Sequence, residues 1–135
     1  HSFPTRRSSD LIEFAIDTFR VERFMAKWIN LDNSDFGMRN AGYTTAKLYD
    51  SLLNKYYKKL LAVLKGEDKK TLVQSQRAWL TFRDRETKLI NMISKDEYSG
   101  GGTMQQLIEA SEYFNLIKNR TITLFEHYVR TTQSY

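Results

Sequence analysis

The sequence contains no cysteine, and its only proline is Pro4. Without cysteine the chain can form no disulfide and offers no thiolate as a nucleophile or metal ligand. Because no proline follows Pro4, the backbone hydrogen bonds of helices can continue uninterrupted along the rest of the chain. No apolar run reaches the roughly 20 residues that a membrane-spanning helix needs. These absences favour a globular domain built from long helices.

Histidine is almost as scarce, since the chain contains only His1 and His127. The serines therefore lack a histidine partner at a useful spacing, and no arrangement for nucleophilic catalysis is evident. No cluster of histidine and carboxylate residues has the spacing of a metal site. We expect a protein that is not an enzyme and that binds no metal or cofactor, with His127 on the surface near a helix end.

The charged residues are mixed in sign, with 21 basic and 16 acidic side chains and a net charge of +5. This excess mildly favours anionic partners. The basic residues alternate with acidic ones instead of clustering, which is not the pattern of a nucleic-acid-binding surface. We therefore expect no nucleic-acid partner.

Apolar residues recur every three or four positions in four separate segments, which is the period of an amphipathic helix. The predicted helices cover about residues 12–29, 38–65, 67–93 and 103–128. Four such helices with short links predict an all-α fold, a compact bundle of four helices, mostly up-and-down. We expect the last three helices to form the core and the first to pack across them. Residues 12–135 would then be a single helical domain.

Turn-forming residues separate the first three helices. Asp32, Ser34 or Asp35 is expected to cap the second helix at its N-terminus. Gly66 is expected to adopt the left-handed conformation after that helix, since glycine favours this conformation.

The segment SGGGT precedes the last helix. Its backbone N–H groups could in principle hold an anion, but it lacks the lysine of a phosphate-binding loop. We therefore interpret Gly101 and Gly102 as an interhelix turn, with Thr103 as the N-cap of the helix that follows.

The most distinctive stretch is QSQRAWLTFRDRE, which we call the signature stretch. On a helix, Trp79 and Phe82 share one side, and several polar residues lie near them. Such a face is either a semi-buried polar network that fixes helix packing or a ligand groove, and the network is the more common case. The expected members of the network are Gln76, Arg83, Glu86 and, from the last helix, Arg120.

The signature stretch, together with SGGGTMQQLIEAS and NRTITLFEHY, resembles the lysozyme inhibitor LprI-like N-terminal domain family over about residues 37–128. The family pattern falls on Gln76, Arg77, Trp79, Phe82, Arg83, Asp84, Glu86, Gly101, Gly102, Met104 and Arg120. Similar proteins often carry cysteines where this chain has Ala41, Thr87 and Glu112. No reliance on disulfides therefore follows for this chain.

The resemblance implies a periplasmic or secreted helical domain of the bacterial envelope that binds a protein, such as a cell-wall-degrading enzyme. The alternative is a structural or accessory helical domain with no enzyme target. Animal-type lysozymes are basic, and this chain is net positive, so long-range electrostatic attraction would not assist their encounter.

The opening stretch HSFPTRRSSDL resembles the in-frame translation of a common sequencing adapter. We therefore expect residues 1–11 to be a non-native, disordered segment. On this interpretation the native N-terminus and any signal peptide are missing from the given sequence.

Overall fold

The computed structural model describes residues 6–132, which are helical except for short turns and contain no strand. The helices are α1 (Arg6–Leu31), α2 (Asp35–Val63), α3 (Glu67–Ile93), α4 (Asp96–Ser99) and α5 (Gly102–Thr132). The all-α prediction is therefore confirmed, with five helices in the described part of the chain instead of four. The additional helix is α4, a single turn within the link that was expected before the last helix.

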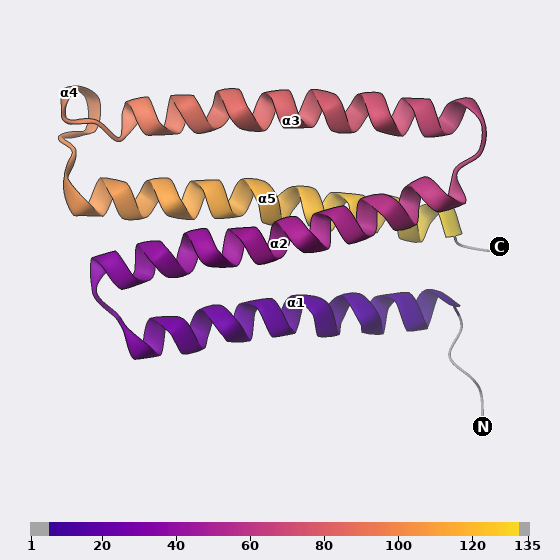
Figure 1. Ribbon diagram of the computed structural model, residues 1–135, viewed down its shortest axis with the longest axis horizontal. Helices are drawn as coiled ribbons and strands as arrows, with labels where there is room; N and C mark the ends of the chain where they lie inside the picture. Colours follow the sequence, from indigo (N-terminus) through magenta and orange to yellow (C-terminus); the bar gives the residue numbers. More distant parts are fainter. Residues whose placement is uncertain (1–5, 133–135) are drawn as a thin grey trace.

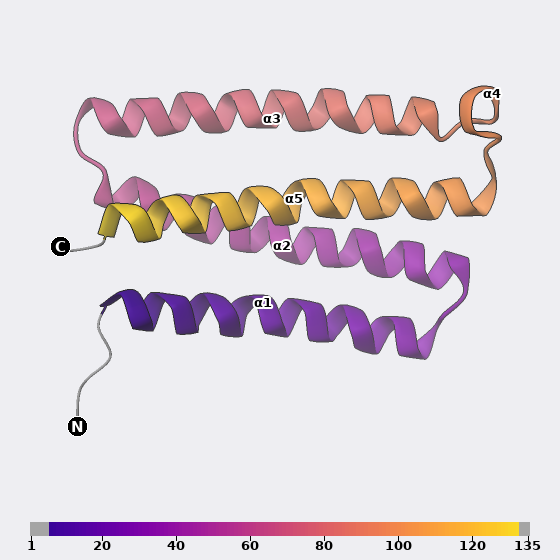
Figure 2. The ribbon, with the colours of Figure 1, turned by 180° about the vertical axis from the view of Figure 1, so that it is seen from behind.

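The four long helices lie side by side and alternate in direction along the chain (Figure 1). The α2 and α5 helices make the most extensive contacts in the molecule, and α1 packs mainly on α2. Among the long helices, α3 makes its main contacts with α5. It lies on the opposite side of the α2–α5 pair from α1, as the view from behind also shows (Figure 2).

The core lies between α2 and α5, whose apolar residues repeat at helical spacing. On α2 the buried residues include Tyr49, Leu53, Tyr56 and Leu60, and on α5 they include Ile117, Thr121, Leu124, Phe125 and Tyr128. The α1 helix adds Val21, which is 7% exposed, and Phe14, whose ring stacks on Phe125 with centroids 3.9 Å apart.

The helices that form this core differ from the prediction, in which α2, α3 and α5 were the central group. Only three residues of α3 are buried, namely Leu72, Gln76 and Ile90. Polar residues interrupt the stripe that α3 turns towards α5, so this face cannot fill one side of an apolar core. The α1 helix takes the expected place of α3.

The predicted turn between α1 and α2 is confirmed in detail. Ser34 is the N-cap of α2, and its hydroxyl oxygen accepts a hydrogen bond from the Gly37 N–H at 3.1 Å. The expectation for Gly66 was wrong: its φ of 52° and ψ of −125° are not the left-handed helical conformation, and it directly precedes α3, whereas α2 ends at Val63.

Two other boundaries were predicted wrongly. Thr103 is not an N-cap, because α5 already begins at Gly102. The preceding turn is made by Gly100, Gly101 and Gly102, whose φ angles of 81°, 61° and 89° favour glycine. The α1 helix begins at Arg6 and not near Ile12, so residues 6–11 are helical instead of disordered, while residues 1–5 lie outside the described part.

Candidate functional site

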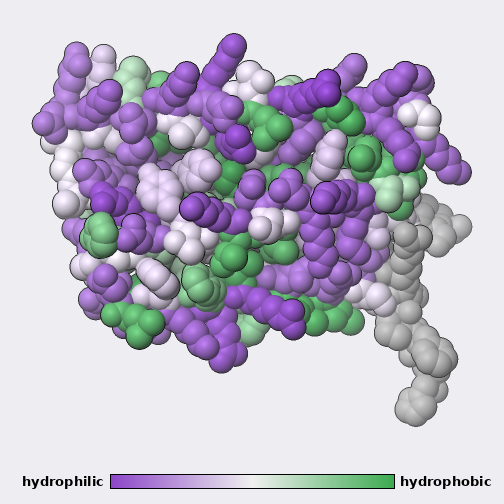
Figure 3. Space-filling view, viewed as in Figure 1, coloured by the Kyte–Doolittle hydropathy of each residue, from purple (hydrophilic) through white to green (hydrophobic). Residues whose placement is uncertain are grey.

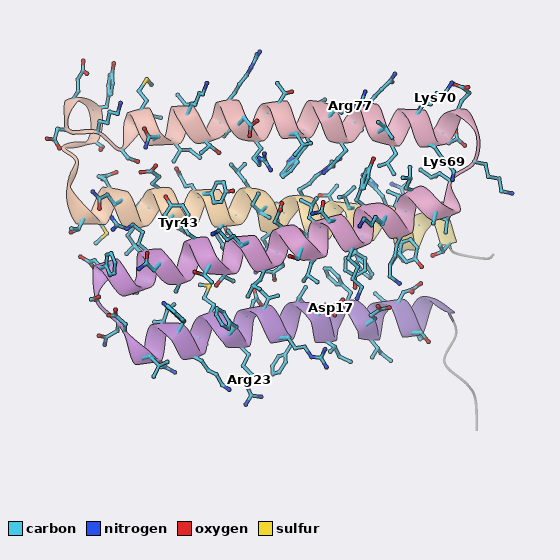
Figure 4. All side chains as sticks on the ribbon, in the orientation of Figure 1. Asp17, Arg23, Tyr43, Lys69, Lys70 and Arg77 are labelled. Carbon is cyan, nitrogen blue, oxygen red and sulfur yellow. The ribbon has the colours of Figure 1, made fainter. Side chains whose placement is uncertain are left out.

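The signature stretch lies in the middle of α3, and most of its side chains face solvent. Hydrophilic side chains predominate along the α3 edge of the molecule, at the top of Figure 3. Figure 4 shows Arg77 on the outer side of α3, pointing away from α5. Arg85 is exposed as well, and Phe82 is 44% exposed. The signature stretch thus presents a basic, partly aromatic ridge that the other helices leave uncovered.

Trp79 is the half-buried residue of the signature stretch that packs against the core cluster. Two guanidinium groups lie near its ring. Arg83 Cζ is 5.7 Å from the ring centroid, and Arg120 Cζ, from α5, is 5.9 Å from it. At these distances each cation is attracted to the π system of the indole. Trp79 therefore joins α3 to α5 through a cation–π contact.

Arg120 forms the polar part of the same junction. Its Nε donates a hydrogen bond to Gln76 Oε1 at 3.0 Å, and its Nη2 donates to Ser75 Oγ at 3.4 Å. Burial lowers the pKa of Arg120, because desolvation disfavours the charged form. Between residues 6 and 132, no carboxylate lies within ion-pair distance of this guanidinium. Neutral oxygens and the indole ring are its partners, and it keeps N–H groups for an external acceptor.

The expected network among Gln76, Arg83 and Glu86 forms only in part. Gln76 is bonded to Arg120 as predicted, but Arg83 pairs with its neighbour Asp84, with Nη2 2.9 Å from Asp84 Oδ1. Glu86 is half-buried and has no hydrogen bond or ion pair within the described part of the chain. Arg83 and Glu86 are therefore not joined, because the adjacent carboxylate occupies the guanidinium.

Gly101 and Gly102 lie far from Trp79, at the α4 end of the molecule (Figure 1). They line a polar cleft of about 450 Å³ together with Asn91, Asp96 and Glu109, among others. A Cβ on Gly101 would lie 1.7 Å from Asp96 Oδ1, so the Asp96 side chain would have to move, and the φ of 61° is strained for any other residue. These two glycines shape the turn between α4 and α5 and do not belong to the Trp79 cluster.

Two further clefts lie between α3 and the α2–α5 pair. One, of about 440 Å³, is lined by residues that include Leu60, Leu72, His127 and Arg130. The other, of about 330 Å³, is more apolar and is lined by Tyr43, Lys47, Thr87, Ile90, Glu109 and Tyr113. Both are large enough to receive a side chain of a bound protein. His127 is exposed at the rim of the larger cleft.

Comparison with protein-family models resolves the family of this chain. The model described as "Lysozyme inhibitor LprI" matches residues 30–124. The chain belongs to the LprI family. No curated protein and no solved structure matches it.

The segment matched by the LprI model contains α2, α3 and α4 whole, together with most of α5. It includes every residue of the signature stretch and Arg120. The resemblance that the signature stretch indicated is therefore confirmed. Only the last two residues of α1 fall inside the match.

A second polar cluster, between α1 and α2, was not foreseen from the sequence. Lys55 Nζ lies 2.8 Å from Glu13 Oε1 and 2.5 Å from Asp17 Oδ2, and Tyr56 Oη donates to the same Asp17 oxygen at 2.8 Å. The signal was present, because Glu13 and Asp17 are four residues apart and so are Lys55 and Lys59. Figure 4 shows Asp17 between the two helices.

The electrostatics of this cluster follow from its contacts. The hydrogen bond from Lys55 lowers the pKa of Glu13 below its usual value. Burial alone would lower the pKa of Lys55, but its bonds to Asp17 and Glu13 outweigh burial and raise it. Burial, reinforced by the bond to Asp17, raises the pKa of Tyr56 well above its usual value. The cluster therefore stabilises the charged forms of Lys55 and Glu13 and the neutral phenol.

Residues 6–132 contain neither a candidate metal site nor a candidate membrane-spanning helix. Their histidine and carboxylate side chains nowhere gather in a group of three or more that could hold a metal ion. None of their helices combines the length and apolar character that crossing a membrane requires.

Proposed function

We propose that this chain is an extracytoplasmic protein-binding module of the bacterial envelope that inhibits a lysozyme. The observation that supports this most directly is the match of the LprI family model to residues 30–124. The proposed location outside the cytoplasm rests on the same family membership, because lysozymes act on the cell wall.

We place the contact surface on the outer ridge of α3. This helix is attached by one side only and presents Arg77, Arg85 and Phe82 to solvent. The substrate cleft of a lysozyme contains two catalytic carboxyl groups. An arginine that enters such a cleft can donate two parallel hydrogen bonds to a carboxylate, and an adjacent aromatic ring adds apolar contact.

Trp79 and Arg120 have a positioning role in this proposal. They hold α3 against α5 at one point along its length, so the ridge keeps a fixed orientation. Fixing the ridge in advance reduces the entropy that would otherwise be lost on binding.

The test is a titration of the purified full chain into a lysozyme assay on bacterial cell walls. We expect inhibition at micromolar concentrations of the chain. The double variant Arg77→Glu with Arg85→Glu should weaken inhibition about tenfold or more, which corresponds to a loss of about 1.4 kcal/mol in binding. The matched control is Lys58→Glu with Lys65→Glu, an equal change of charge at exposed positions outside α3, which should inhibit like the parent chain.

The assay is run at low and at moderate salt, because both proteins are expected to be net positive. Salt screens the long-range repulsion between like charges, so inhibition should not weaken as the ionic strength rises from low values. No loss of lysozyme activity at micromolar excess in either condition would refute inhibition. The chain would then be better described as a structural or accessory helical domain.

A further inference from the structure

The outer face of α1 is a surface that the proposed function leaves unused. Residues on this face are exposed, and the apolar ones are more than two-fifths exposed: Ile12 53%, Ile16 44% and Phe19 62%. Arg20, Arg23 and Lys27 continue the same face towards the C-terminus of the helix and are exposed as well. Figure 4 shows Arg23 pointing away from every other helix. Figure 3 shows hydrophobic and hydrophilic side chains next to each other along this lower edge.

The acidic residues of α1 beyond Leu11 are all turned towards other helices and paired. Glu13 and Asp17 bind Lys55 of α2, and Glu22 binds Lys118 of α5. The unpaired charges on the outer face are therefore basic, and the paired carboxylates of Glu13 and Asp17 line a hollow at its edge together with Ile12, Ile16 and Arg20. In the described part of the chain, none of its three cations, Arg20, Arg23 and Lys27, makes a salt bridge or a hydrogen bond through its side chain.

We propose that this outer face of α1 binds the surface of an anionic phospholipid membrane, with the helix axis parallel to the bilayer. Membrane-surface binding draws on buried apolar area and on attraction to anionic lipids, and this face offers apolar side chains in its first half and Lys and Arg in its second. From Ile12 to Lys27 the face extends about 22 Å along the helix. The aromatic rings of Phe24 and Trp28, both more than a third exposed, flank it and suit the interfacial region of a bilayer.

A second copy of the chain fits this face less well than a lipid surface. Two copies of the face would bring two sets of unpaired cations together, because the carboxylates at its edge are already paired with Lys55 in each copy. Like charges at such close range cost binding energy. Anionic headgroups supply the missing negative charge at any position along the helix, and acyl chains cover the apolar half. The proposal is independent of lysozyme inhibition, because it involves neither α3 nor the segment matched by the LprI model.

The experiment is flotation of the full chain with two kinds of vesicle. One contains equal parts of phosphatidylglycerol and phosphatidylcholine, and the other contains phosphatidylcholine alone. We expect binding to the first, weakened by salt, and little binding to the second. The double variant Arg20→Glu with Arg23→Glu should weaken binding at least about 30-fold, because each cation close to an anionic membrane contributes roughly a factor of five.

Two comparisons show whether α1 is the surface involved. Phe19→Ser should weaken binding at high as well as at low salt, since salt does not screen apolar contact. The α3 variant Arg77→Glu with Arg85→Glu, with the same change of charge, should bind vesicles like the parent chain. All variants should keep the parent's melting temperature, because the substituted side chains are exposed. Absence of binding to the anionic vesicles would overturn the proposal, and so would equal losses from the α1 and α3 variants.

Discussion

Replacing Tyr56 with phenylalanine tests how α1 is held on the core. The Tyr56 hydroxyl donates to Asp17 Oδ2 at 2.8 Å, and the residue is only 1% exposed. Its ring packs edge-on against Phe14 and Phe125, with centroids 5.2 and 5.3 Å away, and phenylalanine preserves both contacts. The substitution therefore removes one hydrogen bond between α1 and α2 and little else.

The size of the effect can be estimated from the surroundings of Asp17. A hydrogen bond to a charged group contributes about 1.5–3 kcal/mol to stability. Asp17 keeps its bond from Lys55 Nζ at 2.5 Å, and its side chain is 14% exposed, so water partly replaces the lost donor. We therefore expect Tyr56→Phe to lower the free energy of unfolding by about 1–2 kcal/mol, or Tm by about 3–7 °C for a domain of this size.

The assay is a double-mutant cycle with Asp17→Asn, followed by thermal unfolding at neutral pH. If the hydroxyl and the carboxylate interact, the combined variant should lose about 1 kcal/mol less than the sum of the single losses. Tyr98→Phe is the control. Because Tyr98 is 61% exposed, this variant should have the melting temperature of the parent chain. Strictly additive losses, or an unchanged Tm for Tyr56→Phe, would refute the reasoning.

Three further predictions concern the core and one turn. Burial raises the pKa of Tyr49 above its ordinary value of 10, so the stability that its neutral phenol contributes is present below pH 10 and lost as the pH rises above it. Tm should therefore fall in alkali, and less steeply in Tyr49→Phe. Leu124→Ala, at a site 0% exposed, should cost about 3–5 kcal/mol in urea unfolding, whereas Trp79→Ala, at a half-buried site, should cost about 2 kcal/mol. Equal losses would mean that α3 belongs to the core. Gly37→Ala should lower Tm clearly, because its Cβ would lie 2.4 Å from a backbone oxygen, while Gly42→Ala, whose nearest neighbour would be 3.6 Å away, should be tolerated.

The sequence predicted individual helices better than their packing. The α2 and α3 helices begin within three residues of the predicted positions, because Ser34 caps α2 and the acidic residues Glu67 and Asp68 suit the first turn of α3. Periodicity shows which face of a helix is apolar, but not which other helix covers it. For that reason α3 was expected in the core, although Gln76 and Arg83 interrupt its stripe, and the peripheral place was given to α1.

In the candidate site too, the sequence indicated some of the residues involved but not how they pair. Gln76 and Arg120 were expected members of one network on neighbouring helices, and they form a hydrogen bond. The pairing of Arg83 with Asp84, and not with Glu86, depends on side-chain rotamers that spacing does not determine. The ion pairs of Lys55 depend on the register between α1 and α2, which no pattern within one helix specifies.

The packing of α3 separates its side chains into two groups with different expected effects. Gln76 and Trp79 contact α5, so substituting them should reduce stability whether or not the chain binds a partner. Arg77 and Phe82 contact solvent, so substituting them should leave the stability nearly unchanged. Measuring Tm and lysozyme inhibition on the same variants therefore distinguishes a binding ridge from a packing motif. In a binding ridge the exposed pair affects inhibition at constant Tm, and in a packing motif inhibition changes only when Tm does.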